Sequence, residues 1–137
     1  MSLNELRDRV HALARAKGWY DGVESPPSPR TVAAWLCNIH GEVSEALEDV
    51  RSGFMAIRFK DIDTGEILTR GQRDEAIERD EEPLSRFKPI GFPIEIADVI
   101  IRALDTAGVL KIDIEDAIAL KHAYNETRSH RHGNKAL

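Results

Sequence analysis

Apolar side chains recur every three or four residues along much of this chain, which is the spacing of one face of an α-helix. The most regular stretch begins at Ser28 and Pro29 and stops at Gly53. Its apolar positions are Val32, Leu36, Ile39, Val43, Leu47 and Val50. Serine is a favoured N-cap, proline suits the first helical position, and glycine commonly follows the last one. The pattern therefore predicts a helix from Pro29 to about Gly53.

Three further helices are predicted, each from a recognisable start signal. Ser2 and Glu5 have the spacing of a capping box, Pro93 suits a first helical position, and Asp113 suits an N-cap. The expected helices begin at these signals and end near Trp19, Gly108 and Arg128. Four helices of this kind predict an all-α, four-helix-bundle-like fold.

Residues 54–92 interrupt the helical pattern. Ile57 to Lys60 alternates between apolar and polar side chains, and Asp63 to Glu66 has the composition of a hairpin tip. The rest of this segment, through Pro83, is polar and is expected to be solvated or mobile. It has too few apolar residues for a core of its own, so we expect a hairpin and loop insertion between the second and third helices. Residues 1–137 are thus predicted to be a single domain.

The composition fits a globular protein, with 137 residues, 42% hydrophobic and 31% charged. No apolar run approaches the roughly 20 residues that cross a bilayer, so no membrane partner is expected. The net charge of −5 argues against a broad basic surface for nucleic acid. The single Cys37 cannot form an intrachain disulfide, and no secretory pattern opens the chain. We expect a cytoplasmic protein.

A polar strip lies beside the apolar stripe of the second helix. At about 100° per residue, Asn38, Glu42, Glu45 and Asp49 fall within roughly 60° of each other, and Trp35 lies at the edge of the strip. Most charge-rich helix faces are simply solvated surfaces, and this helix taken alone would favour that interpretation.

The third helix carries its charges in one strip about 80° wide. Its charged residues are Glu95, Asp98, Arg102 and Asp105. Nearly all of its other residues are apolar or small, and carboxylates beside so much apolar surface are costly unless a cation compensates them. A salt-bridge network of Arg102 with Asp98 and Asp105 is the structural alternative to a bound cation.

If the two acidic strips face each other, they form an all-oxygen metal site. Its predicted ligands are Glu42, Glu45, Glu95 and Asp98. Oxygen ligands favour Mg²⁺ or Mn²⁺, and no histidine follows these acids at i+3 or i+4, as zinc or di-iron sites would require. Asp49 and Asp105 are reserve ligands or supporting groups.

The C-terminal segment has the opposite charge. Lys121, Asn125 and Arg128 lie at i, i+4 and i+7 on the last predicted helix, and Arg131 and Lys135 follow. Such a cluster can be an ordinary basic tail. Beside a carboxylate-metal centre it instead suits phosphate, because arginine forks match phosphate oxygens.

The two acidic motifs and the tail resemble the MazG-like family of the all-α nucleoside triphosphate pyrophosphohydrolase superfamily. The first motif runs from Gly41 to Glu45, and the second reads Glu95-Ile96-Ala97-Asp98. The resemblance covers residues 1–53 and 88–137 and leaves the insertion without a counterpart. Gly41 stands where the family has the first glutamate of a doublet, which leaves a fifth ligand open, and the gap between the motifs is longer than usual.

The resemblance implies hydrolysis of a (deoxy)nucleoside triphosphate to the monophosphate and pyrophosphate, in a homodimer or homotetramer with sites near subunit interfaces. Bound Mg²⁺ or Mn²⁺ would activate a water for attack on the α-phosphorus, with Glu45 and Glu42 as the catalytic carboxylates and Glu45 as the base. The expected phosphate-binding residues are Lys121, Asn125, Arg128, Arg131 and Lys135. Trp35 could stack on the base and Asn38 could bond its edge, although Trp35 also suits the core.

Three alternatives share these residues. Two are enzymes of the same superfamily, a dimeric deoxyuridine triphosphatase and a phosphoribosyl-ATP pyrophosphohydrolase, which differ in the base or sugar pocket. The third is a non-catalytic helical oligomer whose acids form interface salt bridges or a structural cation site.

Overall fold

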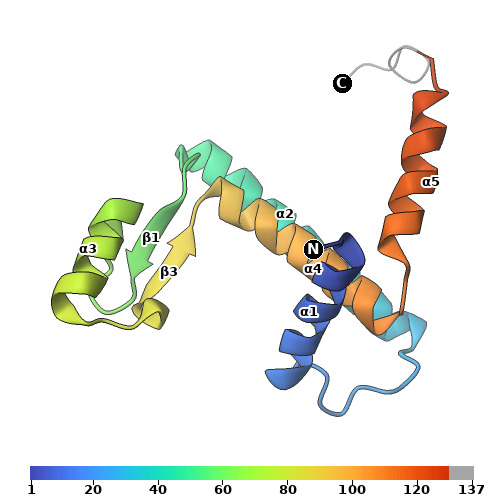
Figure 1. The fold of residues 1–137 in the computed structure, drawn as a ribbon, viewed down its shortest axis with the longest axis horizontal. Helices are drawn as coiled ribbons and strands as arrows, with labels where there is room; N and C mark the ends of the chain where they lie inside the picture. The colour runs from blue at the N-terminus through green and yellow to red at the C-terminus, as the bar shows by residue number, and fades with distance from the viewer. Residues whose placement is uncertain (130–137) are drawn as a thin grey trace. The chain divides into compact units, whose positions relative to one another are not determined.

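The computed structural model describes residues 1–129 and is mainly α-helical (Figure 1). Its helices are α1 (Leu3–Ala16), α2 (Pro29–Ser52), α3 (Arg70–Asp80), α4 (Phe92–Val109) and α5 (Ile114–Glu126). Its strands are β1 (Arg58–Asp61), β2 (Ile67–Leu68) and β3 (Phe87–Ile90), and a 3-10 turn spans Leu84–Arg86. The chain divides into two compact units, residues 29–103 and a unit made of residues 1–28 with the chain from Leu104 onward. None of the described helices is long and apolar enough to cross a bilayer.

The start of α1 confirms the predicted capping box. Ser2 Oγ accepts from the Glu5 amide at 3.1 Å, and the Glu5 carboxylate accepts from the Ser2 amide at 2.6 Å. The helix ends at Ala16, three residues before the predicted Trp19, because Gly18 takes a left-handed φ of 83° and the chain turns away. Within the same unit α1 reaches α5, where the Leu3 amide donates to Glu115 at 2.8 Å.

The start of α2 at Pro29 and its stop at Gly53 are as predicted. Gly53 has a φ of 77°, its amide donates to Val50, and the Phe54 amide donates to Asp49 at 2.8 Å. These two bonds satisfy carbonyls at the end of the helix in the Schellman pattern. Asp113 caps α5 as predicted, accepting from the Asp116 amide at 3.1 Å.

The two ends of the insertion lie next to each other, between the end of α2 and the start of α4. The Phe92 amide donates to the Phe54 carbonyl at 2.8 Å, so the end of α2 meets the start of α4. Gly91 has a φ of 108°, and a Cβ there would lie 2.4 Å from the Ala56 carbonyl oxygen. Only glycine permits this approach. From this joint α2 and α4 run side by side in opposite directions (Figure 1).

The predicted hairpin is present, but the expectation that the insertion has no core of its own is wrong. Antiparallel strands in the order β2-β1-β3 place Phe59 opposite Leu68 on one side and Pro89 on the other. The stretch expected to be solvated contains α3, which begins with a capping box of Thr69 and Gln72. The insertion also has a small core of its own. This core consists of Phe59, Leu68 and Phe87, with Ile57, Ala76 and Ile77 packed against it.

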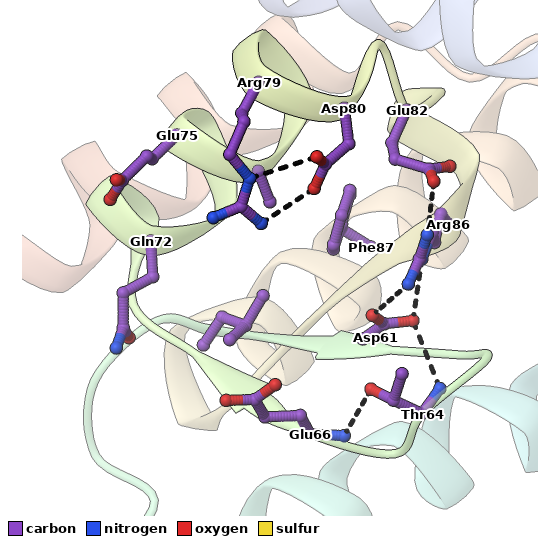
Figure 2. A pocket seen from close by; sticks show the side chains of 12 residues that line it. Asp61, Thr64, Glu66, Gln72, Glu75, Arg79, Asp80, Glu82, Arg86 and Phe87 are labelled. Atoms are coloured by element: carbon purple, nitrogen blue, oxygen red, sulfur yellow. Dashed lines mark hydrogen bonds and ion pairs between the residues drawn. The ribbon is translucent and has the colours of Figure 1, made fainter.

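A buried ion pair fastens β1 to the turn before β3 (Figure 2). Asp61 is only 4% exposed, and its two oxygens accept from Arg86 Nε at 3.0 Å and Nη2 at 2.8 Å. The amides of Asp63 and Thr64 donate to the same carboxylate. The Arg86 hydrogen bonds are the main reason that the pKa of Asp61 lies well below its usual range. Asp61, Thr64 and Arg86 line an open cavity of about 300 Å³.

The apolar stripe expected to form the bundle core is not buried within one chain. Seven large apolar side chains of α2 and α4 are between 39% and 51% exposed, namely Leu36, Val43, Leu47, Val50, Ile96, Ile100 and Ile101. We call this set the apolar face. The residues of α2 that are buried are Glu42 and Ala46. The mainly-α class is confirmed, whereas the four-helix bundle stays a prediction.

Candidate metal centre

Three carboxylates from the antiparallel helices come together. Glu42 of α2 and Glu95 and Asp98 of α4 each offer an oxygen, and these oxygens all lie within 4.8 Å of one another. Glu95 and Asp98 share one face of α4 because they are three residues apart. Glu42 is 8% exposed, and the other two are half-buried. The cluster can therefore hold a metal ion.

The electrostatics of the cluster favour a cation. Burial raises the pKa of Glu95, and the charges of Glu45, Asp49, Asp98 and Glu42 raise it further. The pKa of Asp98 is also raised, first by burial and then by Glu42, although two nearby cations oppose the shift. Each shift means that the ionised form is disfavoured where it stands. A bound divalent ion would relieve both the burial cost and the mutual repulsion.

Asp49 shows where another ligand atom is available. Within residues 1–129, its Oδ2 is the one buried side-chain oxygen or nitrogen that has no hydrogen-bond partner. Leaving such an acceptor unsatisfied is costly, and a metal ion is one of the partners that can satisfy it. Asp49 is close enough to Glu95 to raise its pKa. The residues present therefore fit a hard cation with oxygen ligands, and Asp49 lies near enough to act on Glu95.

Glu45 lies beside the cluster rather than inside its tightest group. It is exposed and is not among the three carboxylates with mutually close oxygens. Its charge is nevertheless the largest electrostatic contribution to the raised pKa of Glu95. The structure thus brings three of the four predicted ligands together and places the fourth carboxylate next to Glu95.

The two remaining charged residues of α4 have partners on other helices. Arg102 forms an ion pair through Nε with Glu42 Oε1. Asp105 accepts from His11 Nδ1 of α1 at 2.8 Å, and burial together with a hydrogen bond to Asp105 raises the pKa of Tyr20. Asp105 therefore bonds to residues of its own unit and is not one of the clustered carboxylates.

The contact of α1 with α4 depends on a glycine. A Cβ on Gly108 would lie 2.6 Å from His11 Cβ, so a larger residue would push the helices apart. His11 and Tyr20 line an open cavity of about 780 Å³ together with Arg15 and Lys111. The sequence does not reveal this cluster, because His11 and Asp105 are 94 residues apart.

The predicted substrate residues lie in both units. Trp35 is half-buried and Asn38 is exposed on α2, in the same unit as the carboxylates. Lys121 and Asn125 are exposed on α5, and Arg128 follows the end of that helix. The Lys121 and Arg128 cations lie 5.0 and 5.9 Å from the centre of the Tyr124 ring. Arg131 and Lys135 lie outside the described residues.

Part of the chain is similar to a characterised enzyme. Over 37 residues it is 51% identical to a dATP/dGTP diphosphohydrolase of Cyanophage S-2L, a match that covers 27% of this chain and 35% of the phage protein. The match thus spans about a third of the relative's length. No family model and no solved structure matches the chain. The similarity supports a relation to nucleotide pyrophosphohydrolases, and membership of the MazG-like family stays a prediction.

Proposed function

We propose that this protein is a metal-dependent, MazG-like enzyme that hydrolyses a (deoxy)nucleoside triphosphate to the monophosphate and pyrophosphate. The observation that carries the proposal is the carboxylate cluster of Glu42, Glu95 and Asp98. The partial similarity to a dATP/dGTP diphosphohydrolase supports the substrate class. Both units, residues 1–137, serve one functional domain in this proposal.

The cluster would hold Mg²⁺ or Mn²⁺ through Glu42, Glu95 and Asp98, with Glu45 and Asp49 available to complete the ligand set. When bound, such an ion neutralises phosphate charge and makes a water more acidic. Glu45 is exposed beside Glu95. In this proposal its carboxylate accepts a proton from the attacking water. Glu42 takes part in catalysis through its place among the ligands.

Binding of the nucleotide is assigned to the polar and aromatic side chains predicted from the sequence. Trp35 would stack on the base, and Asn38 would donate to or accept from its edge. The phosphates would be held by Lys121, Asn125, Arg128, Arg131 and Lys135. Arginine and lysine are suited to this role, because they stabilise the charge that develops on the leaving pyrophosphate.

The enzyme is proposed to be a homodimer or homotetramer. The apolar face carries seven large side chains that are between 39% and 51% exposed. Large apolar patches are uncommon on the surface of monomeric proteins. A second copy could cover this face and complete a four-helix bundle from two helix pairs, as isologous interfaces commonly do.

The first experiment is a pyrophosphate-release assay on a panel of substrates, with Mn²⁺ and with a chelator. The panel contains dATP, dGTP, dUTP, the ribonucleotides and phosphoribosyl-ATP, so that it also separates the superfamily alternatives. We expect Mn²⁺-dependent release from at least one deoxynucleoside triphosphate, and its loss in Asp98→Asn. No release from any substrate would favour the non-catalytic oligomer, in which the Arg102–Glu42 pair is purely structural.

A further inference from the structure

Arg102 already occupies part of the candidate metal centre. Its Nε pairs with Glu42 Oε1, one oxygen of the residue that links α2 to the cluster. Arg102 also lies one turn after Asp98 on α4, and its charge lowers the pKa of Asp98 against the upward effect of burial. A side-chain cation thus sits beside two of the three clustered carboxylates.

The two members of this pair differ in their exposure. The Glu42 side chain is 10% exposed, whereas the Arg102 side chain is 41% exposed. Glu42 therefore depends on a nearby cation, because a buried carboxylate is costly without one. A large part of the Arg102 side chain, in contrast, already meets water. If another cation satisfied Glu42, Arg102 would lose this ion pair while its side chain kept its contact with water.

The Arg102 guanidinium and a divalent ion held by the three carboxylates would compete for the charge of Glu42. An ion held by Glu42, Glu95 and Asp98 would stand within several Å of the guanidinium, and the two positive charges would repel each other. The more highly charged ion gains more from the three carboxylates than one guanidinium does. Metal binding should therefore displace Arg102 from Glu42.

We infer that Arg102 is an exchangeable counter-cation that holds Glu42 in the metal-free protein, yields it to the metal ion, and then binds the triphosphate. The inference rests on the proposed function. After displacement, Arg102 remains anchored on α4 one turn from Asp98, so its guanidinium stays beside the metal centre. A planar fork with a permanent charge binds phosphate oxygens in pairs, which a lysine cannot reproduce.

The first test measures the affinity for Mn²⁺ alone by calorimetric titration. Arg102→Gln should bind Mn²⁺ about tenfold more tightly than the wild type, because a competing charge several Å from the ion is gone. Arg102→Lys keeps the charge and should stay near the wild type. Arg51→Gln is the matched control, since Arg51 pairs with Glu48 on the exposed side of α2. Equal or weaker Mn²⁺ binding by Arg102→Gln would overturn the inference.

Thermal unfolding keeps the test informative if the variant is less stable. Without metal, Arg102→Gln should melt at a lower temperature than the wild type, because Glu42 loses its partner. Saturating Mn²⁺ should remove this difference, since the ion takes over Glu42. A difference that persists at saturating Mn²⁺ would mean that Arg102 is needed at Glu42 even when the metal is bound, contrary to the exchange.

The second test measures binding of α,β-methylene-dATP, which cannot be cleaved at that bond, to the Mn²⁺-loaded proteins. Arg102→Gln should bind it about tenfold more weakly, with Arg102→Lys in between and Arg51→Gln unchanged. Equal affinities for wild type and Arg102→Gln would remove Arg102 from the phosphate site. A different result would contradict the proposed function itself, namely that the wild type binds no Mn²⁺.

Discussion

A buried acid is paired with an arginine in both parts of the unit formed by residues 29–103. In the insertion, Asp61 receives two hydrogen bonds from Arg86 and two more from backbone amides. In the helix pair, Glu42 faces Arg102 on one side and two further carboxylates on the other. The pKa of Asp61 is lowered by its partners, whereas the pKa values of Glu95 and Asp98 are raised.

The difference distinguishes an ion pair that supports the fold from acids that are available to a ligand. The Asp61 carboxylate is surrounded by donors, so a further cation would gain little there. The helix pair has more acid than one arginine can neutralise, and Asp49 Oδ2 has no hydrogen-bond partner among the described residues. Burial and an arginine partner therefore do not identify a site, whereas an excess of unsatisfied acceptors does.

The largest expected effect concerns turnover in the helix pair. Glu45→Gln should lower kcat by about a hundredfold or more, because it removes the proposed base and a charge beside Glu95. Glu48→Gln, on the same helix and paired with exposed Arg51, should leave kcat nearly unchanged. Steady-state kinetics with Mn²⁺ makes the comparison. Equal losses in the two variants would show that the wrong face of α2 has been assigned.

The next effect should appear in the insertion as a loss of stability. Arg86→Ala leaves Asp61 buried without its main partner, so the melting temperature at pH 7 should fall by about 5 °C or more. The Mn²⁺ affinity of the helix pair should not change.

The pH dependence of this pair has a definite sign. Because the pKa of Asp61 is lowered in the folded protein, the pair stabilises above the unfolded pKa of about 4. This contribution is lost as the pH falls toward the folded pKa. The difference in melting temperature between the wild type and Arg86→Ala should therefore become smaller below about pH 4. A difference that is constant with pH would contradict the ionic origin of the effect.

In the helix pair, we expect a smaller effect of pH on stability, with the opposite sign to that of Asp61. The pKa of Asp98 is raised by folding, so its ionisation weakens the metal-free fold as the pH rises from the unfolded to the folded pKa. Asp98→Asn should therefore keep or slightly raise the melting temperature at pH 7 in chelator. Mn²⁺ should stabilise this variant less than the wild type. If Asp98→Asn melts at a lower temperature than the wild type in chelator, Asp98 supports the fold, as Asp61 does.

The smallest effects come from two helical glycines, one in each part. A Cβ on Gly41 of α2 or on Gly71 of α3 would meet no atom within 4 Å. Gly41→Ala lies inside its helix and should stabilise by about 0.5–1 kcal/mol, while Gly71→Ala lies in the first turn and should gain less. Urea unfolding curves measure both. A loss at Gly41 would indicate that this part of α2 must remain free of side chains.

Local signals explain why most helix boundaries could be predicted. The capping box of Ser2 and Glu5 and the N-cap Asp113 each use residues within one turn, so their geometry can be read from the chain itself. The equivalent signal of Thr69 and Gln72 was also present. This signal does not stand out in the sequence because α3 is mostly polar, and its apolar residues Ala76 and Ile77 pack against side chains of the sheet.

Contacts between distant residues were harder to predict. Counting angles around each helix correctly brought Glu42, Glu95 and Asp98 together, since two narrow acidic strips leave few ways to pair. The angular positions did not predict the ion pair of Arg102 with Glu42, because that pair depends on how α2 and α4 are aligned. The exposure of the apolar face was not foreseen either, since periodicity shows that a face is apolar and not what covers it.

The joint between Phe54 and Phe92 has a consequence for how such a protein can change over evolutionary time. The chain leaves the end of α2 and comes back to the start of α4 at a single hydrogen bond of 2.8 Å. Everything between these points has its own sheet, helix and core. The segment is therefore an exchangeable cassette, which a lineage can lengthen, shorten or replace by a tight turn while the carboxylates of the two helices keep their alignment.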